Sequence, residues 1–187
     1  MRALIKKKSF GEKIIFQDAV FSVREGSRTA VVGPSGAGKT TLMRILSGLD
    51  HDYAGRIEGA PEHPVILFQE DRLSEHIAVL PNLMAVTDSR SEAISILGEL
   101  SLSGEEHTPI KELSGGMKRR VAIARALLVD TDCLFLDEPF RGLDDDARRL
   151  AASLILRREE GKTIVFITHS EEDLSLLHAD DIIRVGC

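Results

Sequence analysis

A glycine-rich segment, Gly33–Thr40, is the feature that most constrains the fold of this 187-residue chain. Its sequence, Gly-Pro-Ser-Gly-Ala-Gly-Lys-Thr, fits the pattern G-x-x-x-x-G-K-[ST] at every fixed position. An apolar run, Thr29–Val32, precedes it, and a helical pattern, Lys39–Ser47, follows it. Such a strand–loop–helix unit points backbone N–H groups and a helix N-terminus at one place, which suits the phosphates of a nucleotide. The segment therefore predicts an α/β fold with a nucleotide site.

Each residue type in this loop has a chemical reason to be there. Gly33, Gly36 and Gly38 allow unusual backbone angles and let phosphates approach the main chain. The Lys39 amine can neutralise β- and γ-phosphates, and the Thr40 hydroxyl can bind Mg²⁺. The complete predicted phosphate-binding set is Gly33, Pro34, Ser35, Gly36, Ala37, Gly38, Lys39, Thr40 and Thr41. GTPases, kinases and many ATPases share this loop, so alone it indicates only a nucleotide.

Two consecutive carboxylates, Asp137 and Glu138, follow the apolar run Cys133–Leu136. Open α/β sheets bind ligands beyond the C-terminal ends of their strands, so both residues are well placed to act on a bound nucleotide. We expect Asp137 to hold Mg²⁺ through water and Glu138 to polarise an attacking water molecule. Because a phosphate loop lies upstream, this interpretation is favoured over a plain acidic turn.

Short apolar runs alternate with helical patterns, which predicts a P-loop NTPase core with a mainly parallel sheet flanked by helices. The first third is rich in strands, including Lys13–Val23, and is expected to form an antiparallel β subdomain. Between about residues 70 and 112 strand patterns give way to helices such as Ser89–Leu100. We therefore expect one domain over residues 1–187, with this helical subdomain inserted in the α/β core. Further elements are expected at Ser27–Val32, Val65–Phe68, Ser114–Leu128, Asp144–Glu160, Thr163–Thr168 and Asp181–Val185.

Composition narrows the classes of protein that fit. A formal net charge of −6 is unlike that of a general nucleic-acid binder, so no nucleic-acid partner is expected. No apolar run reaches the roughly 20 residues needed to cross a bilayer, and Met1–Lys8 lacks the apolar core of a secretory signal. Cys133 and Cys187 form no metal-ligand spacing. We expect a cytosolic protein that depends on other chains for any membrane part.

A second glycine-containing segment, Leu113–Met117, opens a helix. Ser114 is a good N-cap, and Gly115 and Gly116 leave backbone N–H groups open at the helix start. A second anion-binding device is explained most simply if it completes a nucleotide site on another copy of the protein. A flexible linker into an ordinary helix is the alternative interpretation.

With these motifs in this order, the chain resembles the ATP-binding subunits of ABC transporters over about residues 10–185. Leu113–Met117 resembles the LSGGQ signature of that family, with Met117 where glutamine is commonest. Arg141 and Gly142 also depart from the small residues common before the D-loop Leu-Asp. The other matches are Gln69 for the Q-loop, Gly142-Leu143-Asp144 for the D-loop, His169 for the switch histidine and Phe10 for the aromatic that stacks on adenine.

The resemblance implies an ATPase that uses Mg²⁺ and works as a head-to-tail dimer with two ATP molecules between its copies. The residues implied in catalysis are Glu138, His169, Lys39 and Gln69, and those implied in metal binding are Thr40, Gln69 and Asp137. Phe10 and Ile15 would contact the nucleotide together with the phosphate loop. The residues implied to reach it from the second copy are Ser114, Gly115, Gly116, Met117 and Asp144.

The resemblance also implies the motor subunit of a transporter, peripheral on the inner face of the cell membrane. Its helical insertion would dock on transmembrane permease subunits, and a solute-binding protein would be an indirect partner. Gln69–Leu73 resembles the Q-loop region of importers for nitrate, sulfonate, taurine and related solutes, and Glu138–Phe140 is also importer-like. The resemblance therefore favours import of a small solute.

Three other functions compete with this prediction. A soluble ABC ATPase acting on DNA or ribosomes would carry long heptad segments or a second such domain, and the sequence contains neither. A nucleotide-binding subunit that hydrolyses ATP only in complex would have the same motifs but release no phosphate alone. A GTPase or kinase would leave Ser114–Met117 unexplained, and no Asn-Lys-x-Asp motif occurs.

Overall fold

The computed structural model describes residues 1–186, which form two compact units. The first unit contains Met1–Ile66, Thr131–Asp137 and the chain from Gly161 onward. The second unit contains Leu67–Asp130 and Glu138–Glu160. Each unit is therefore assembled from stretches that lie far apart in the sequence.

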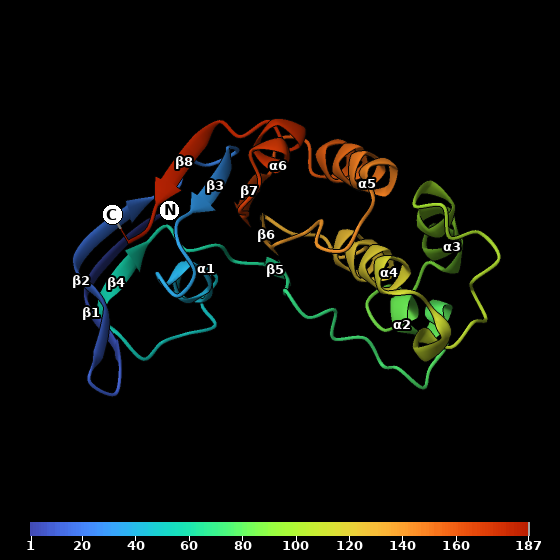
Figure 1. Cartoon of the computed structure of the whole chain (residues 1–187), viewed down its shortest axis with the longest axis horizontal. Helices are drawn as coiled ribbons and strands as arrows, with labels where there is room; N and C mark the ends of the chain where they lie inside the picture. The colour runs from blue at the N-terminus through green and yellow to red at the C-terminus, as the bar shows by residue number, and fades with distance from the viewer. Residues whose placement is uncertain (187) are drawn as a thin grey trace. The chain divides into compact units, whose positions relative to one another are not determined.

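A three-stranded antiparallel sheet forms one layer of the first unit (Figure 1). Its order is β2-β1-β4, with β1 at Arg2–Phe10, β2 at Lys13–Ser22 and β4 at Ala54–Glu58. Ala3 and Ile5 of the central strand are buried, at 0% and 1% exposure. The register between β1 and β2 shifts between Lys8 and Ser9, a bulge that interrupts the regular alternation of inward and outward side chains. The predicted antiparallel subdomain at the N-terminus is thus present.

A five-stranded sheet with the order β5-β6-β7-β3-β8 forms the other layer. Its strands are β3 (Arg28–Val32), β5 (Pro64–Leu67), β6 (Cys133–Asp137), β7 (Thr163–Ile167) and β8 (Asp181–Arg184). Three strand pairs of this sheet are parallel: β6 with β7, β7 with β3, and β3 with β8. All residues of β6 and β7 are buried, which explains why both appear in the sequence as continuous apolar runs. Helix α6 (Glu171–Leu176) connects β7 to β8.

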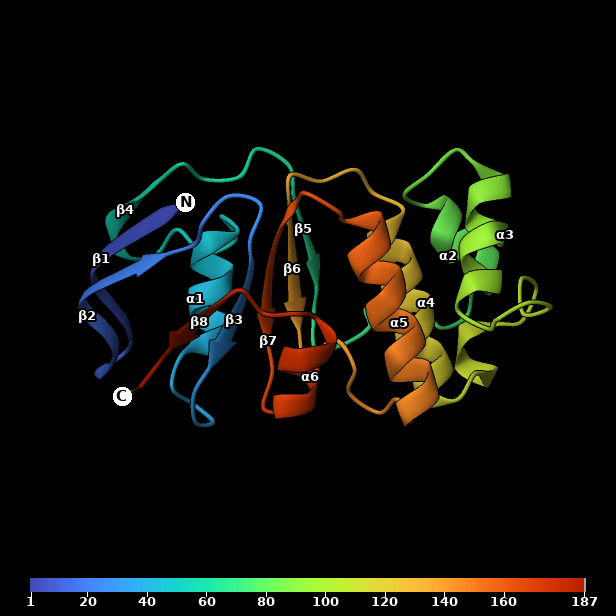
Figure 2. The same cartoon turned by 90° about the horizontal axis from the view of Figure 1, so that it is seen from above.

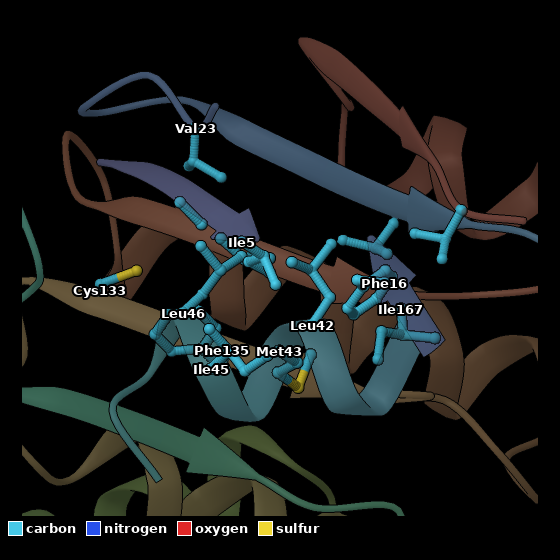
Figure 3. Packing of buried hydrophobic residues seen from close by; sticks show 14 residues of the cluster. Ile5, Phe16, Val23, Leu42, Met43, Ile45, Leu46, Cys133, Phe135 and Ile167 are labelled. Carbon is cyan, nitrogen blue, oxygen red and sulfur yellow. The ribbon is translucent and has the colours of Figure 1, made fainter. Parts of the chain in front are cut away.

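Helix α1 (Lys39–Leu46) lies between the two sheets of the first unit (Figure 2). Eight residues are too few for a helix that is stable alone, so packing holds it in place. Burial of each large apolar side chain contributes about 1.5–3 kcal/mol. Figure 3 shows the cluster, whose labelled members are Ile5, Phe16, Val23, Leu42, Met43, Ile45, Leu46, Cys133, Phe135 and Ile167. The helix ends at Ser47, and Gly48 follows in the left-handed conformation expected of it, with φ 72°.

The second unit is helical. It contains α2 (Val79–Met84), α3 (Arg90–Glu99), a 3₁₀ helix (Ile110–Glu112), α4 (Gly115–Leu127) and α5 (Asp145–Arg158). Helix α4 contacts α2, α3 and α5 and is therefore the centre of the unit. Arg158 of α5 donates to Glu92 and Glu99 of α3 at 3.0 and 3.1 Å, which ties these two helices together. The unit includes the predicted helical segment and, in addition, α4 and α5.

The predicted fold class is confirmed: an α/β protein with a parallel sheet, an N-terminal antiparallel sheet and a helical part. The single-domain organisation over the whole chain stays a prediction. The sequence did not reveal β1 or β4 as strands. Three consecutive lysines, Lys6–Lys8, hide the apolar alternation of β1, and β4 has no fully buried residue.

Within residues 1–186, no helix is both long enough and apolar enough to cross a membrane.

Candidate functional site

The phosphate loop connects β3 to α1 in the first unit, as the motif requires. Gly33 has φ 154°, and a Cβ there would overlap the carbonyl oxygen of Val185, so only glycine fits. Gly38 has φ 103°, and a Cβ there would lie 2.6 Å from Cγ2 of Ile15. Ile15 therefore packs directly on the loop. Its contact with a nucleotide stays a prediction.

The amine of Lys39 is held by the loop itself. The residue is 7% exposed, and its Nζ donates to the carbonyl oxygens of Gly33 and Pro34 at 2.8 and 2.9 Å. A bound phosphate would offer charged oxygens to the same N–H donors, and charge-assisted hydrogen bonds are the stronger kind. The positive charge of Lys39 therefore lies at the phosphate loop.

Thr40 and Asp137 meet at one point of the first unit, although they are 97 residues apart in the sequence. The Thr40 hydroxyl donates to Oδ2 of Asp137 at 3.1 Å, and Asp137 is 4% exposed. Mg²⁺ prefers hard oxygen ligands and is usually bound by one or two protein oxygens, substrate phosphates and water. A hydroxyl and a carboxylate beside a phosphate loop fit that pattern. In residues 1–186 no group of three or more His, Cys, Asp or Glu residues could hold a metal.

His169 follows β7 and lines a cavity of about 290 Å³ in the first unit together with Gly33. Its neighbours in sequence are fixed by hydrogen bonds. The Thr168 hydroxyl donates to Asp173 and accepts from the N–H of Ser170 at 3.0 Å. The predicted switch histidine therefore lies on a held backbone, at a cavity that reaches the first glycine of the phosphate loop.

Phe10, the predicted adenine-stacking residue, ends β1 and is 55% exposed. Its stacking on a base stays a prediction. The Nζ of Lys8 lies 4.7 Å from the centre of its ring. Lys8 is itself buried and bonds to Asp50 Oδ1 at 2.9 Å and to the carbonyl of Asp52 at 2.7 Å. A hydrogen bond to Asp50 raises the pKa of Lys8 even though burial opposes its charge. No sequence pattern indicates this buried lysine, because it stands in a run of lysines.

The second unit brings together Gln69 and Glu138. Nε2 of Gln69 donates to Oε2 of Glu138 at 3.2 Å. Glu138 has φ 47°, an uncommon left-handed backbone for a residue with a long side chain. Arg119, which no sequence motif marks, also belongs here, since its guanidinium donates to the carbonyl of Glu138. A basic residue just after a glycine-rich helix start is ordinarily taken for an exposed one.

The signature and D-loop segments also meet in the second unit. Ser114 caps α4 by accepting a hydrogen bond from the N–H of Met117 at 3.3 Å. A Cβ on Gly116 would lie 3.2 Å from the carbonyl oxygen of Gly142, so glycine keeps the two segments close. Asp144 caps α5 through the N–H of Ala147 at 2.8 Å. The anion-binding role of Ser114–Met117 at the start of α4 stays a prediction.

The fold and the phosphate loop together define a P-loop nucleotide-binding protein. Comparison with known proteins identifies the family within this class. Residues 16–141 match the family described as ABC transporter. The chain is 39% identical over 188 residues to the aliphatic sulfonates import ATP-binding protein SsuB 3 of Paraburkholderia xenovorans, covering 96% of this chain and 75% of that one. The chain therefore belongs to the ABC transporter family and is an ATP-binding domain of it.

Other relatives and a solved structure agree. A sulfate/thiosulfate import ATP-binding protein of Rhizobium meliloti is 34% identical over 191 residues, covering 89% of this chain and 52% of that one. The dimeric structure of a post-hydrolysis state of the ATP-binding cassette MJ0796, bound to ADP and Pi, superposes with a TM-score of 0.80. That pair is 25% identical, and the match covers 99% of this chain and 94% of the other. The family resemblance drawn from the sequence is confirmed.

Proposed function

We propose that this chain is the ATP-hydrolysing subunit of an importer for a small oxyanionic solute. The observation that carries the hydrolytic part is the contact of Thr40 with Asp137 beside the phosphate loop. It supplies two oxygen ligands for Mg²⁺ where the β- and γ-phosphates are expected. The import part is supported by relatives whose names are those of sulfonate and sulfate/thiosulfate import proteins.

In this proposal the chain's own residues have separate tasks. The backbone N–H groups of Gly33 and of residues 35–38 bind the triphosphate. Lys39 exchanges its two carbonyl partners for phosphate oxygens. Thr40 and Asp137 would hold Mg²⁺, which would neutralise phosphate charge. Glu138, next in the chain after Asp137, accepts a proton from the attacking water as general base. His169 orients the reacting phosphate.

The proposed active form is a head-to-tail dimer. The phosphate loop of one copy would face Ser114–Met117 of the other, whose capped helix start leaves glycine N–H groups for the phosphates. The dimeric assembly of the matched cassette structure supports this arrangement. The membrane partners would be permease subunits, and the named relatives, which are import proteins, support this role over one on DNA or ribosomes.

ATPase rate per subunit against protein concentration, for wild type and Glu138→Gln, tests the hydrolytic part. We expect a wild-type rate that rises with concentration, because two copies make the site. The variant should turn over about 100-fold more slowly while binding ATP as tightly as wild type. Wild-type turnover by Glu138→Gln would remove Glu138 from the base role, and a wild type that binds no ATP would overturn the proposal.

Co-purification tests the transport part. A tagged chain expressed at its natural level in its own organism should isolate integral membrane proteins from detergent-solubilised membranes. Recovery from ribosomes or nucleoid fractions instead would favour the soluble alternative. Uptake of a labelled sulfonate, compared between wild-type and Lys39→Ala cells, would then test the class of solute.

A further inference from the structure

The Arg119 side chain is buried in the second unit, at 3% exposure, although it is charged. It lies in the first turns of α4, five residues after Ser114. Its neighbour Arg120 bonds to the carbonyls of Leu100 and Ser101 instead. A buried charge is stable only where hydrogen bonds compensate its lost hydration, so the partners of Arg119 indicate what it does.

The guanidinium of Arg119 joins two loops to α4. Nε donates to the carbonyl of Pro139 at 2.8 Å, and Nη2 donates to the carbonyl of Glu138 at 2.8 Å. Nη1 donates to the carbonyl of Phe68 at 2.7 Å and to Oδ1 of Asp71 at 3.1 Å. One planar group with five N–H donors in fixed directions thus holds the backbone of both loops.

These two loops carry the pair of side chains proposed for catalysis. Gln69 lies between Phe68 and Asp71 on one loop, and Glu138 begins the other. Their side chains meet at 3.2 Å. The bonds from Arg119 therefore fix the backbones on both sides of that contact.

The backbone of Glu138 gives a second reason to assign this role to Arg119. At φ 47° the residue is in a sparsely populated backbone region that persists only when its surroundings hold it. Its carbonyl oxygen is held by Arg119 and also accepts from the N–H of Arg141 at 3.2 Å. The direction of the Glu138 side chain follows from this backbone, so it depends on the guanidinium.

We propose that Arg119 is a positioning residue that sets Glu138 and Gln69 in their catalytic geometry. The inference rests on the proposed ATPase function. Arg119 holds the base by its backbone, so the carboxylate can face Gln69. Lysine could not replace it fully, because an ammonium on a flexible stem cannot meet four acceptors lying in different directions.

Steady-state kinetics of Arg119→Gln test the proposal, with Arg120→Gln as the matched control. Both variants lose one arginine from adjacent positions of the same helix. We expect kcat of Arg119→Gln to fall about 10- to 100-fold, because small misplacements of a catalytic group cost that much. Its Kd for ATP, measured with a fluorescent analogue, should change by less than about twofold. Arg119→Lys should give an intermediate kcat, and Arg120→Gln a kcat close to wild type.

Hydrogen–deuterium exchange provides a readout that does not need hydrolysis. In Arg119→Gln, peptides covering residues 68–72 and 138–141 should exchange faster, with the rest of α4 protected as in wild type. In Arg120→Gln the faster exchange should appear near residues 100–101 instead. If both variants merely lose global stability, exchange will rise everywhere, which would overturn the positioning role.

The outcomes separate this inference from the proposed function. A wild type that hydrolyses ATP, together with Arg119→Gln at wild-type kcat, overturns the inference and leaves the function standing. A wild type that neither binds nor hydrolyses ATP overturns the proposed function. In that case the exchange pattern still decides whether Arg119 holds the two loops, and unchanged exchange at residues 68–72 and 138–141 overturns it.

Discussion

The side-chain amide of Gln69 donates a hydrogen bond to the carboxylate of Glu138 at 3.2 Å, across 69 residues of sequence. The bond fixes the position of a Glu138 carboxylate oxygen relative to the loop that carries Gln69. A carboxylate held in one position suits the base role proposed for Glu138. The contact also predicts that substitution of Gln69 changes the activity that depends on Glu138.

Gln69→Glu should move the acid limb of the pH–rate profile to higher pH. Two carboxyl groups in hydrogen-bond range resist ionising together, so one of them keeps its proton to a higher pH. Activity that needs an ionised base is then lost earlier as the pH falls. The profile of kcat between pH 5 and 9 measures the shift. Gln69→Ala removes the amide without adding charge and should lower kcat with a smaller shift, and an unmoved limb in Gln69→Glu would contradict the base role.

Asp137→Asn should raise the Mg²⁺ concentration needed for half-maximal activity by about 10-fold or more, as loss of a residue that holds or orients a metal typically does. The neutral amide keeps the volume and the contact with Thr40 but removes the charge. Titration of Mg²⁺ at saturating ATP measures the effect. Thr40→Ser keeps the hydroxyl and should stay near wild type, whereas Thr40→Ala should resemble Asp137→Asn. Equal Mg²⁺ requirements in all four proteins would exclude this metal site.

Lys8→Met should lower the free energy of unfolding by about 3 kcal/mol, because breaking a buried ion pair leaves its other charge uncompensated. Lys8 and Asp50 pair at 2.8 Å, and the lysine side chain is 1% exposed. Lys7→Met on the same strand removes an exposed lysine and should change stability little. Urea denaturation at pH 7 measures both variants, and equal losses would contradict the special role of Lys8.

The ion pair between Lys8 and Asp50 also predicts how the free energy of unfolding depends on pH. Burial opposes ionisation of Asp50, but hydrogen bonds from Lys8 and from the N–H of Asp52 outweigh it and lower the pKa of Asp50 below 3.8. A lowered folded pKa gives stability that is present above pH 3.8 and is lost as the pH falls through the folded value. Wild type should therefore lose more stability than Lys8→Met between pH 5 and pH 3. Parallel acid titrations by circular dichroism would show no such difference if the pair contributes nothing.

The Cys133 thiol should resist alkylation in the folded protein. Burial raises its pKa to about 12, so almost no thiolate exists near pH 8. A Cys187→Ser variant leaves Cys133 as the single thiol of the chain. Its reaction with iodoacetamide at pH 8 should be slow until denaturant unfolds the first unit. Rapid labelling of the native protein would contradict the burial of Cys133, the first residue of β6.

The sequence predicted the elements whose signals are local. The phosphate loop contains its own glycines, lysine and threonine, and the strand and helix beside it follow from adjacent apolar patterns. The capping residues Ser114 and Asp144 likewise accept hydrogen bonds from N–H groups only a few residues further along the chain. Helix and strand limits predicted from such signals differ from the structure by one or two residues.

Features that depend on distant partners were not predictable. Strand β1 is stabilised by pairing with β2 and β4, and its lysine at position 8 is buried because Asp50 lies more than forty residues further along. In the sequence Arg119 resembles any basic residue on a helix. Its burial depends on hydrogen bonds to Phe68 and Glu138, which lie far from it in the sequence. In both cases the charge is buried by contacts that no local pattern contains.

Gly33 has a role that does not depend on ATP. A side chain there would overlap the carbonyl of Val185, so this glycine is required for the end of β8 to lie against the loop. Natural selection for folding alone would therefore preserve it. A descendant of this protein that had lost hydrolysis could replace the proposed base Glu138 and still keep the first glycine of the motif. The presence of Gly33 is therefore evidence of the fold, whereas Glu138 is the residue that indicates hydrolysis.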